Sequence, residues 1–134
     1  MGIFDKIFKK EEIQEEVQGE KKDLPKKKPK NLKDETMLDI INNSKIPVVV
    51  DCWADWCVPC KQIAPSIAEL AAEFDGEVLI AKLNTEKNRK MSQRYSVRSI
   101  PTILYFKDGR FITRTVGALP KSTIKKAIEN YLLK

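Results

Sequence analysis

A run of apolar and β-branched residues at positions 46–53 limits most strongly what this chain can fold into. The run reads Ile-Pro-Val-Val-Val-Asp-Cys-Trp and contains a single charged residue. A strand that is apolar on both sides is typical of a sheet covered on both faces. Residues 58–74 follow almost directly, with apolar side chains at helical spacing up to Gly76. A buried strand followed almost directly by a helix predicts an α/β domain.

The chain from residue 31 onward continues this alternation of helices and strands. Helices are predicted at residues 35–43, 88–95 and 121–133, and strands at residues 78–83, 102–106 and 111–116. The Lys-Asp-Gly-Arg sequence at 107–110 predicts a hairpin turn between the last two strands. This order predicts a three-layer α/β/α domain with a central mixed sheet.

Residues 1–30 have a different composition from the rest of the chain. They hold nine lysines and seven acidic residues, and two prolines interrupt the final lysine run. Because proline cannot continue a helix, we expect a flexible charged extension at 1–30 and a folded domain at 31–134. Four apolar residues at helical spacing predict a short amphipathic helix within the extension: Ile3, Phe4, Ile7 and Phe8. We expect it to tether or localise the protein, with a solubilising tail as the alternative and only weak membrane contact.

Composition excludes several classes of function for this 134-residue chain of net charge +6. No apolar run approaches the roughly 18 residues of a membrane-spanning helix. The first apolar cluster lacks the continuous core of a signal peptide, which predicts a cytoplasmic protein. Acidic residues interleave with the basic ones, and no aromatic residues lie among the tail lysines, so nucleic-acid binding is not expected.

Cys57 and Cys60 carry the chemistry that the sequence predicts. They enclose Val58-Pro59 at the start of the predicted helix 58–74. Backbone N–H groups and the helix dipole favour a thiolate at Cys57, and Cys60 lies about one turn further along. We therefore predict that Cys57 attacks a disulfide and that Cys60 resolves the mixed disulfide. A zinc site is one, weaker alternative, because the chain has no histidine and no second cysteine pair. The other alternative is that the two cysteines have this spacing by chance.

Four segments resemble the thioredoxin family, in the family's order and at compatible spacings. They are Val-Asp-Cys-Trp-Ala-Asp-Trp-Cys-Val-Pro-Cys-Lys at 50–61, Ala-Lys-Leu-Asn at 81–84, Ile-Pro-Thr at 100–102 and Val-Gly-Ala-Leu at 116–119. The resemblance covers residues 31–134. It implies the thioredoxin fold and a protein-disulfide reductase, a monomer that needs no bound cofactor or metal. A thioredoxin reductase would supply electrons, and disulfide-containing client proteins would receive them, which maintains the thiol redox balance.

The resemblance also assigns roles to individual catalytic residues. Cys57 matches the family's attacking cysteine, and Cys60 matches its resolving cysteine. Asp51 matches the buried aspartate that exchanges a proton with the resolving thiol, and burial suits a carboxylate to that task. Lys82 matches the lysine near that aspartate, and an ion pair between the two is a compatible structural interpretation.

A second group of residues matches the family's surface for client proteins. Pro101 matches the proline held cis opposite the cysteines, and the backbone at Ile100 is expected to pair with the client chain. The remaining residues of the expected docking surface are Trp56, Val58, Pro59, Gly117 and Ala118. Trp53 is expected to pack in the core instead.

Two departures from the family pattern matter, and Ser99, where glycine is common, is a minor third. Val58 stands where glycine is usual, and Cys52 stands where an aromatic residue is more usual. We expect Cys52 to behave as a small buried hydrophobic residue. Two other functions remain open: a recruitment module docked by its tail, and an oxidase or isomerase on the same fold. The Val-Pro dipeptide, with no histidine between the cysteines, favours a reductase.

Overall fold

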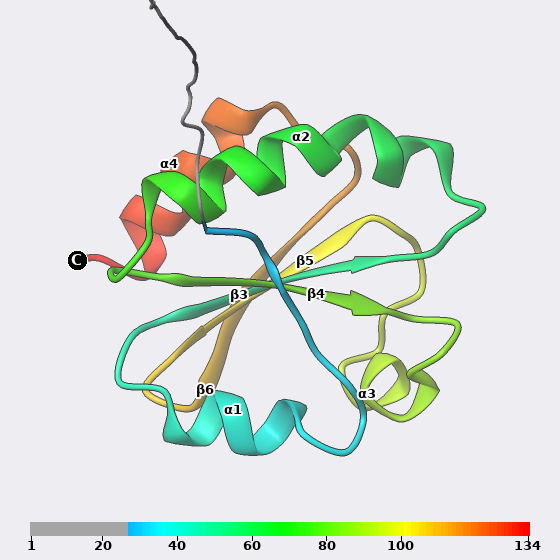
Figure 1. Cartoon of the computed structure of the whole chain (residues 1–134), viewed down its shortest axis with the longest axis horizontal. Coiled ribbons are helices and arrows are strands. Elements are labelled where there is room, and N and C mark those ends of the chain that lie inside the picture. The colour runs from blue at the N-terminus through cyan, green and yellow to red at the C-terminus, as the bar shows by residue number, and fades with distance from the viewer. Residues whose placement is uncertain (1–26) are drawn as a thin grey trace, which may run out of the picture.

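A computed structural model describes residues 27–134, in which a five-stranded sheet lies between two layers of helices (Figure 1). In spatial order the strands are β2 (Lys30–Asn31), β4 (Leu79–Asn84), β3 (Val48–Trp53), β5 (Thr102–Lys107) and β6 (Arg110–Val116). The first three are parallel, β5 runs antiparallel to β3, and β6 runs antiparallel to β5. The predicted three-layer domain with a mixed sheet is confirmed.

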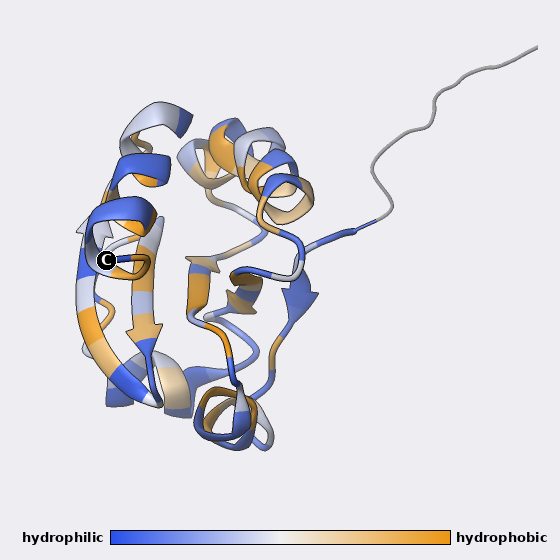
Figure 2. Ribbon diagram, turned by 90° about the vertical axis from the view of Figure 1, so that its left-hand side faces the viewer, coloured by the Kyte–Doolittle hydropathy of each residue, from blue (hydrophilic) through white to orange (hydrophobic). Residues whose placement is uncertain are grey.

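Helices cover both faces of the sheet. On one face lie α2 (Val58–Glu73) and α4 (Lys121–Tyr131), and on the other lie α1 (Met37–Asn43) and α3 (Arg89–Arg94) (Figure 1). Side chains of β3 alternate between the layers: Val49 packs with α2 and α4, whereas Val48 and Val50 pack with α1. Figure 2 shows the apolar residues gathered between the sheet and its helices.

The predicted hairpin turn is present between β5 and β6. Asp108 and Gly109 both have positive φ angles, 53° and 76°, and Lys107 pairs with Arg110 across the turn. Such angles are typical of two-residue hairpin turns, in which Asp-Gly is favoured. The other predicted helices and strands from residue 35 onward are also present, with ends shifted by one to two residues.

Strand β2 was not predicted. Lys30 pairs with Ala81 and Asn31 with Lys82, and the Leu32 N–H donates a 2.8 Å hydrogen bond to the Lys82 carbonyl. Two polar residues that pair through backbone atoms leave no hydropathy pattern, so the strand resembled the end of a linker. The sheet thus begins one residue before the expected domain start at 31. The predicted helix around Ile3 lies outside the described residues.

Strand register brings two loops that are distant in sequence to the same end of the central strands β3 and β5. Cys52 pairs with Thr102 in the antiparallel ladder of β3 and β5. The residues after Cys52 and those before Thr102 therefore lie at the same end of the sheet, where α2 begins. This end of the sheet holds both the cysteine pair and the predicted cis-proline loop. Among residues 27–134, no helix is long and apolar enough to cross a membrane.

Candidate active site

Cys57 is the residue at which helix α2 begins. Its backbone is extended, with φ −88° and ψ 106°, and its Sγ accepts a 3.1 Å hydrogen bond from the Cys60 N–H. Pro59 lies in the first turn, where a missing N–H costs no helical hydrogen bond. The sulfur of Cys57 thus faces the Cys60 N–H and the positive end of the helix dipole. Both stabilise a thiolate when the pair is reduced.

Cys57 and Cys60 form a disulfide, with their Cα atoms 5.3 Å apart. Both residues are buried, but their surroundings differ. Cys57 lines an adjacent groove with a volume of about 720 Å³, and Cys60 does not. A molecule in the groove therefore meets the sulfur of Cys57 first, and Cys60 lies behind it within the helix.

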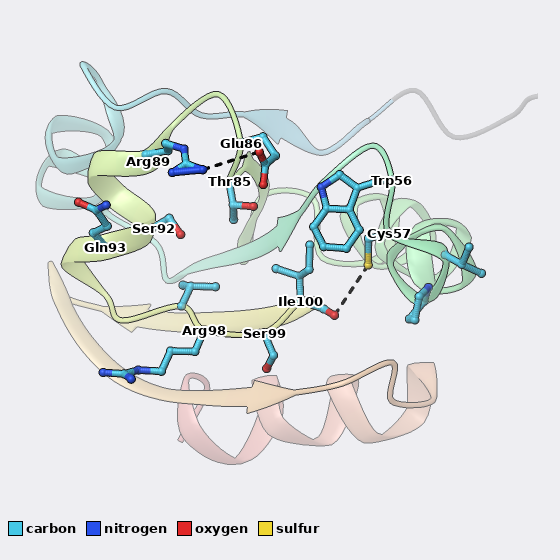
Figure 3. A pocket seen from close by; sticks show the side chains of 13 residues that line it. Trp56, Cys57, Thr85, Glu86, Arg89, Ser92, Gln93, Arg98, Ser99 and Ile100 are labelled. Atoms are coloured by element: carbon cyan, nitrogen blue, oxygen red, sulfur yellow. Dashed lines mark hydrogen bonds and ion pairs between the residues drawn. The ribbon is translucent and has the colours of Figure 1, made fainter.

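The Ile100–Pro101 loop lies opposite the disulfide. Its peptide bond is cis, and the Ile100 carbonyl oxygen lies 3.7 Å from the Cys57 Sγ (Figure 3). The Gly117 N–H donates a 2.8 Å hydrogen bond to the Pro101 carbonyl, which joins the start of the loop after β6 to this site. Gly117 has φ +100°, a conformation that favours glycine. The structure thus brings Pro101 and Gly117 together.

Asp51 lies behind the site on β3 and is almost fully buried. Neither of its carboxylate oxygens has a hydrogen-bond partner in the described part of the chain. Burial raises the pKa of Asp51 from 3.8 to about 6, against a smaller opposing effect of the Lys82 charge. By strand alternation Asp51 faces the same layer as Val49, the layer of α2, which carries Cys60.

Lys82 lies beside Asp51 without forming the ion pair considered from the sequence. The two residues are opposite one another in the parallel register of β3 and β4. The Lys82 ammonium instead lies 4.7 Å from the ring centroid of Trp53. Trp53 packs against the cluster formed by Ala54, Cys57 and Cys60, in agreement with the expected core role.

Cys52 faces the opposite layer from Asp51 and is completely buried. Burial, and secondarily the Asp51 carboxylate, raise the pKa of its thiol to about 12, while Arg114 opposes the shift. A thiol in this state is a poor nucleophile at neutral pH. Its surroundings agree with the expected role of a small hydrophobic residue.

The groove beside Cys57 contains some of the predicted docking residues and several that the sequence did not indicate. Trp56, Val58, Pro59 and Ile100 line it, whereas Pro101, Gly117 and Ala118 are not in its lining. Its other wall was missed from the sequence and consists of Thr85, Glu86, Arg89, Ser92, Gln93, Val97, Arg98 and Ser99 (Figure 3). A run of basic residues between 86 and 98 was the available signal.

Closing the bond between Cys57 and Cys60 oxidises the protein by two electrons, and opening it reverses the change. On a three-layer α/β fold, with the reacting sulfur at a helix N-terminus, this chemistry defines a thiol–disulfide oxidoreductase.

Comparisons with known proteins identify the family within this class. A family model described as Thioredoxin matches residues 28–130. "Thioredoxin 1" of Nostoc is 39% identical over 99 residues, 74% of this chain and 92% of that protein. "Thioredoxin" of Haemophilus influenzae is 42% identical over 102 residues, 76% of this chain and 95% of that protein. "Thioredoxin M-type, chloroplastic" of spinach is 44% identical over 106 residues, 79% of this chain but 59% of that protein. The chain belongs to the thioredoxin family, and its CxxC dithiol reduces disulfides in proteins.

Proposed function

We propose that Cys57 attacks the client disulfide and that Cys60 resolves the resulting mixed disulfide. One observation carries this assignment: Cys57 lines the groove and Cys60 does not. A client sulfur that enters the groove therefore approaches Cys57. Hydrogen-bond donation from the Cys60 N–H to the Cys57 Sγ favours the same residue as the nucleophile.

The electrons and protons balance over two exchange steps. The Cys57 thiolate forms a bond to one client sulfur, the client disulfide breaks, and the other client sulfur leaves as a thiolate that takes up a proton. The Cys60 thiol then loses its proton, and its sulfur attacks Cys57. The bond between Cys57 and the client breaks, and the second client sulfur is released and protonated. The client gains two electrons and two protons, and the protein is left as the disulfide.

Asp51 is the residue that we assign to proton transfer for Cys60. Its pKa of about 6 means that the carboxylate is present at neutral pH and is able to accept a proton. Neither of its oxygens has a hydrogen-bond partner in the described part of the chain, so both are free to accept a proton. Lys82 limits the rise in the Asp51 pKa and so keeps the carboxylate ionised in the working range.

The client chain is proposed to bind across the end of the sheet that holds the Ile100–Pro101 loop. The Ile100 carbonyl lies beside Cys57, within reach of a backbone N–H of an extended client segment. Trp56 and Val58, at 66% and 62%, are the most exposed large apolar side chains of the described residues, and both line the groove, which suits them to docking. The rest of the proposed docking surface comprises Pro59, Pro101, Gly117 and Ala118.

We further propose a thioredoxin reductase as the electron donor and client proteins with disulfides as acceptors. This direction of transfer is the one favoured in a reducing compartment. We place the protein in the cytoplasm as a monomer, with a plastid as the alternative because some relatives are named chloroplastic. Imaging of the tagged protein in its own cells distinguishes these compartments. Residues 1–30 are proposed to localise the protein and to take no part in the chemistry of the domain.

An insulin-reduction assay with a chemical dithiol as donor tests the assignment of the two cysteines. Wild-type protein accelerates insulin precipitation, Cys57→Ser is inactive, and Cys60→Ser accumulates a mixed disulfide with insulin that is visible on a non-reducing gel. Cys52→Ser is the matched control and retains activity. Equal turnover by wild type and Cys57→Ser, or trapping by Cys57→Ser instead of Cys60→Ser, contradicts the proposal.

A further inference from the structure

The two walls of the groove beside Cys57 differ in charge. Trp56, Val58 and Pro59 form an uncharged wall next to the reacting sulfur. The opposite wall comes from the segment 86–98, which has five basic residues and one acidic residue, a net charge of +4. The basic residues are Lys87, Arg89, Lys90, Arg94 and Arg98. Of the charged residues in this segment, Arg89, Arg98 and the acidic Glu86 line the groove itself.

Arg89 has only a weak partner in this wall. Its guanidinium lies 4.0 Å from the Glu86 carboxylate, and the two side chains are 68% and 51% exposed (Figure 3). Ion pairs as exposed as this one contribute little stability. The Arg89 guanidinium is therefore able to turn to a carboxylate on a bound chain at small cost.

Arg98 lies in the same wall, two residues before Ile100, and is exposed. Two neighbouring arginines are engaged elsewhere: Arg94 lies over the Tyr95 ring, and Arg114 donates a hydrogen bond to the Ser96 carbonyl. Arg98 has neither an ion pair nor a hydrogen bond to any residue in the 27–134 range. Its guanidinium is directed away from Cys57 (Figure 3), so its charge is available to the outer part of a chain bound in the groove.

A side-chain cap from a distant part of the chain holds this wall in place. The Asp34 carboxylate accepts hydrogen bonds of 2.9 Å from the Met91 N–H and 3.3 Å from the Lys90 N–H, at the first turn of α3. The Asp34 N–H in turn donates a 2.9 Å hydrogen bond to the Asn88 Oδ1. The backbone that carries Arg89 is therefore positioned before a client arrives, which lowers the ordering cost of binding.

We propose that the groove selects client disulfides flanked by aspartate or glutamate, and that Arg89 and Arg98 are the residues that determine this specificity. The inference rests on the proposed role of Cys57 as the attacking cysteine. Acidic groups beside the client cysteine would meet the basic wall, while apolar groups would meet Trp56. Complementary charges of this kind raise association rates and suppress partners of like charge.

Three matched peptides test the preference. Each carries one central cysteine as a mixed disulfide with pyridine-2-thiol, flanked on both sides by Glu, Gln or Lys. The reduced full-length protein reacts with each in stoichiometric amounts, and release of pyridine-2-thione is followed by absorbance. Each rate is divided by the rate with 2-mercaptoethanol, which removes differences in the reactivity of the peptides themselves. The Glu peptide is expected to react about tenfold faster than the Lys peptide at low salt, and less so at high salt.

Two charge-matched double variants locate the source of the preference. Arg89→Glu with Arg98→Glu changes the groove, and Lys45→Glu with Arg110→Glu makes the same change in net charge at the opposite end of the sheet. The groove variant is expected to lose or invert the ratio of Glu to Lys peptide rates, and the control to keep most of it. Single Arg89→Gln and Arg98→Gln variants, which remove one charge each, should each lower the ratio.

Equal rates for the three peptides with wild type overturn the proposal, as does an equal effect of the two double variants, which would reflect net charge alone. Either result leaves the role of Cys57 intact if all three peptides react. Reaction of Cys57→Ser at the wild-type rate would instead contradict the proposed function itself.

Discussion

Asp51 and Lys82 lie directly opposite one another in neighbouring parallel strands, yet they form no ion pair. The Lys82 ammonium is directed to the Trp53 ring, 4.7 Å from its centroid. The Asp51 carboxylate is left buried and without a hydrogen-bond partner in the described residues, which keeps its pKa at about 6. A stronger pair would lower that pKa and weaken the carboxylate as a proton acceptor near neutral pH.

Replacing this carboxylate is expected to stabilise the protein in a pH-dependent way. The folded-state pKa of about 6 lies above the ordinary value of 3.8, so the native state binds the extra proton between those pH values. Ionised Asp51 therefore destabilises the fold as the pH rises through that range. Asp51→Asn should gain up to about 3 kcal/mol relative to wild type between about pH 4 and pH 8.

Urea unfolding of the oxidised proteins across this range measures the effect. Asp108→Asn makes the same chemical change on the exposed hairpin turn, and its difference from wild type should not follow the same profile. A difference between Asp51→Asn and wild type that stays constant with pH would show that burial of Asp51 does not destabilise the fold.

The same substitution is expected to slow release of the client. Without a carboxylate to accept the Cys60 proton, decay of the mixed disulfide should slow by at least about tenfold near neutral pH. The deficit should shrink at alkaline pH, where solvent removes the proton directly. Single-turnover kinetics with a fluorescent disulfide peptide measure this decay, and an unchanged rate from about pH 6 to pH 9 would refute proton transfer by Asp51.

Cys52 is expected to be inert while the protein is folded. Its thiol is fully buried, with a pKa raised to about 12. Iodoacetamide should therefore label Cys57 of the reduced native protein, and label Cys52 only after denaturation. Peptide mapping by mass spectrometry distinguishes the sites. Labelling of Cys52 at a rate comparable to Cys57 would show that it has access to solvent.

Asp34 is expected to hold α3 against the rest of the domain. Asp34→Ala removes the acceptor for the Lys90 and Met91 N–H groups and should cost about 1 kcal/mol of stability. Those two amides should also exchange hydrogen faster. Asp39→Ala, an exposed acidic residue of α1, is the control. Protection of the two amides at wild-type level would contradict the capping role.

Removal of residues 2–26 is expected to leave reductase activity within a factor of about two, because the residues of the site lie from position 51 onward. The truncation stops before Lys30, since that residue pairs with Ala81 in the sheet. Insulin reduction and thermal unfolding of both forms provide the measurement. A truncated protein that folds normally but loses most of its rate would place the extension at the active site.

Elements whose signals are local could be predicted from the sequence. The apolar run of β3, the Asp-Gly turn after β5 and the placement of Cys57 before α2 depend on residues that are adjacent in the chain. Hydropathy period, turn chemistry and helix capping act over a few residues, so they can be read from one segment. The other residues of the cysteine site were predicted from the motifs shared with the family.

Features that depend on distant partners could not be predicted from the sequence and became visible in the folded domain. Strand β2 forms through backbone pairing with β4, which leaves no side-chain pattern to read. The direction of the Lys82 ammonium depends on the position of Trp53 in the next strand, and α3, which carries Arg89, is held by the Asp34 carboxylate from a distant part of the chain. Packing and strand register set these distances between groups far apart in sequence, and no local propensity encodes them.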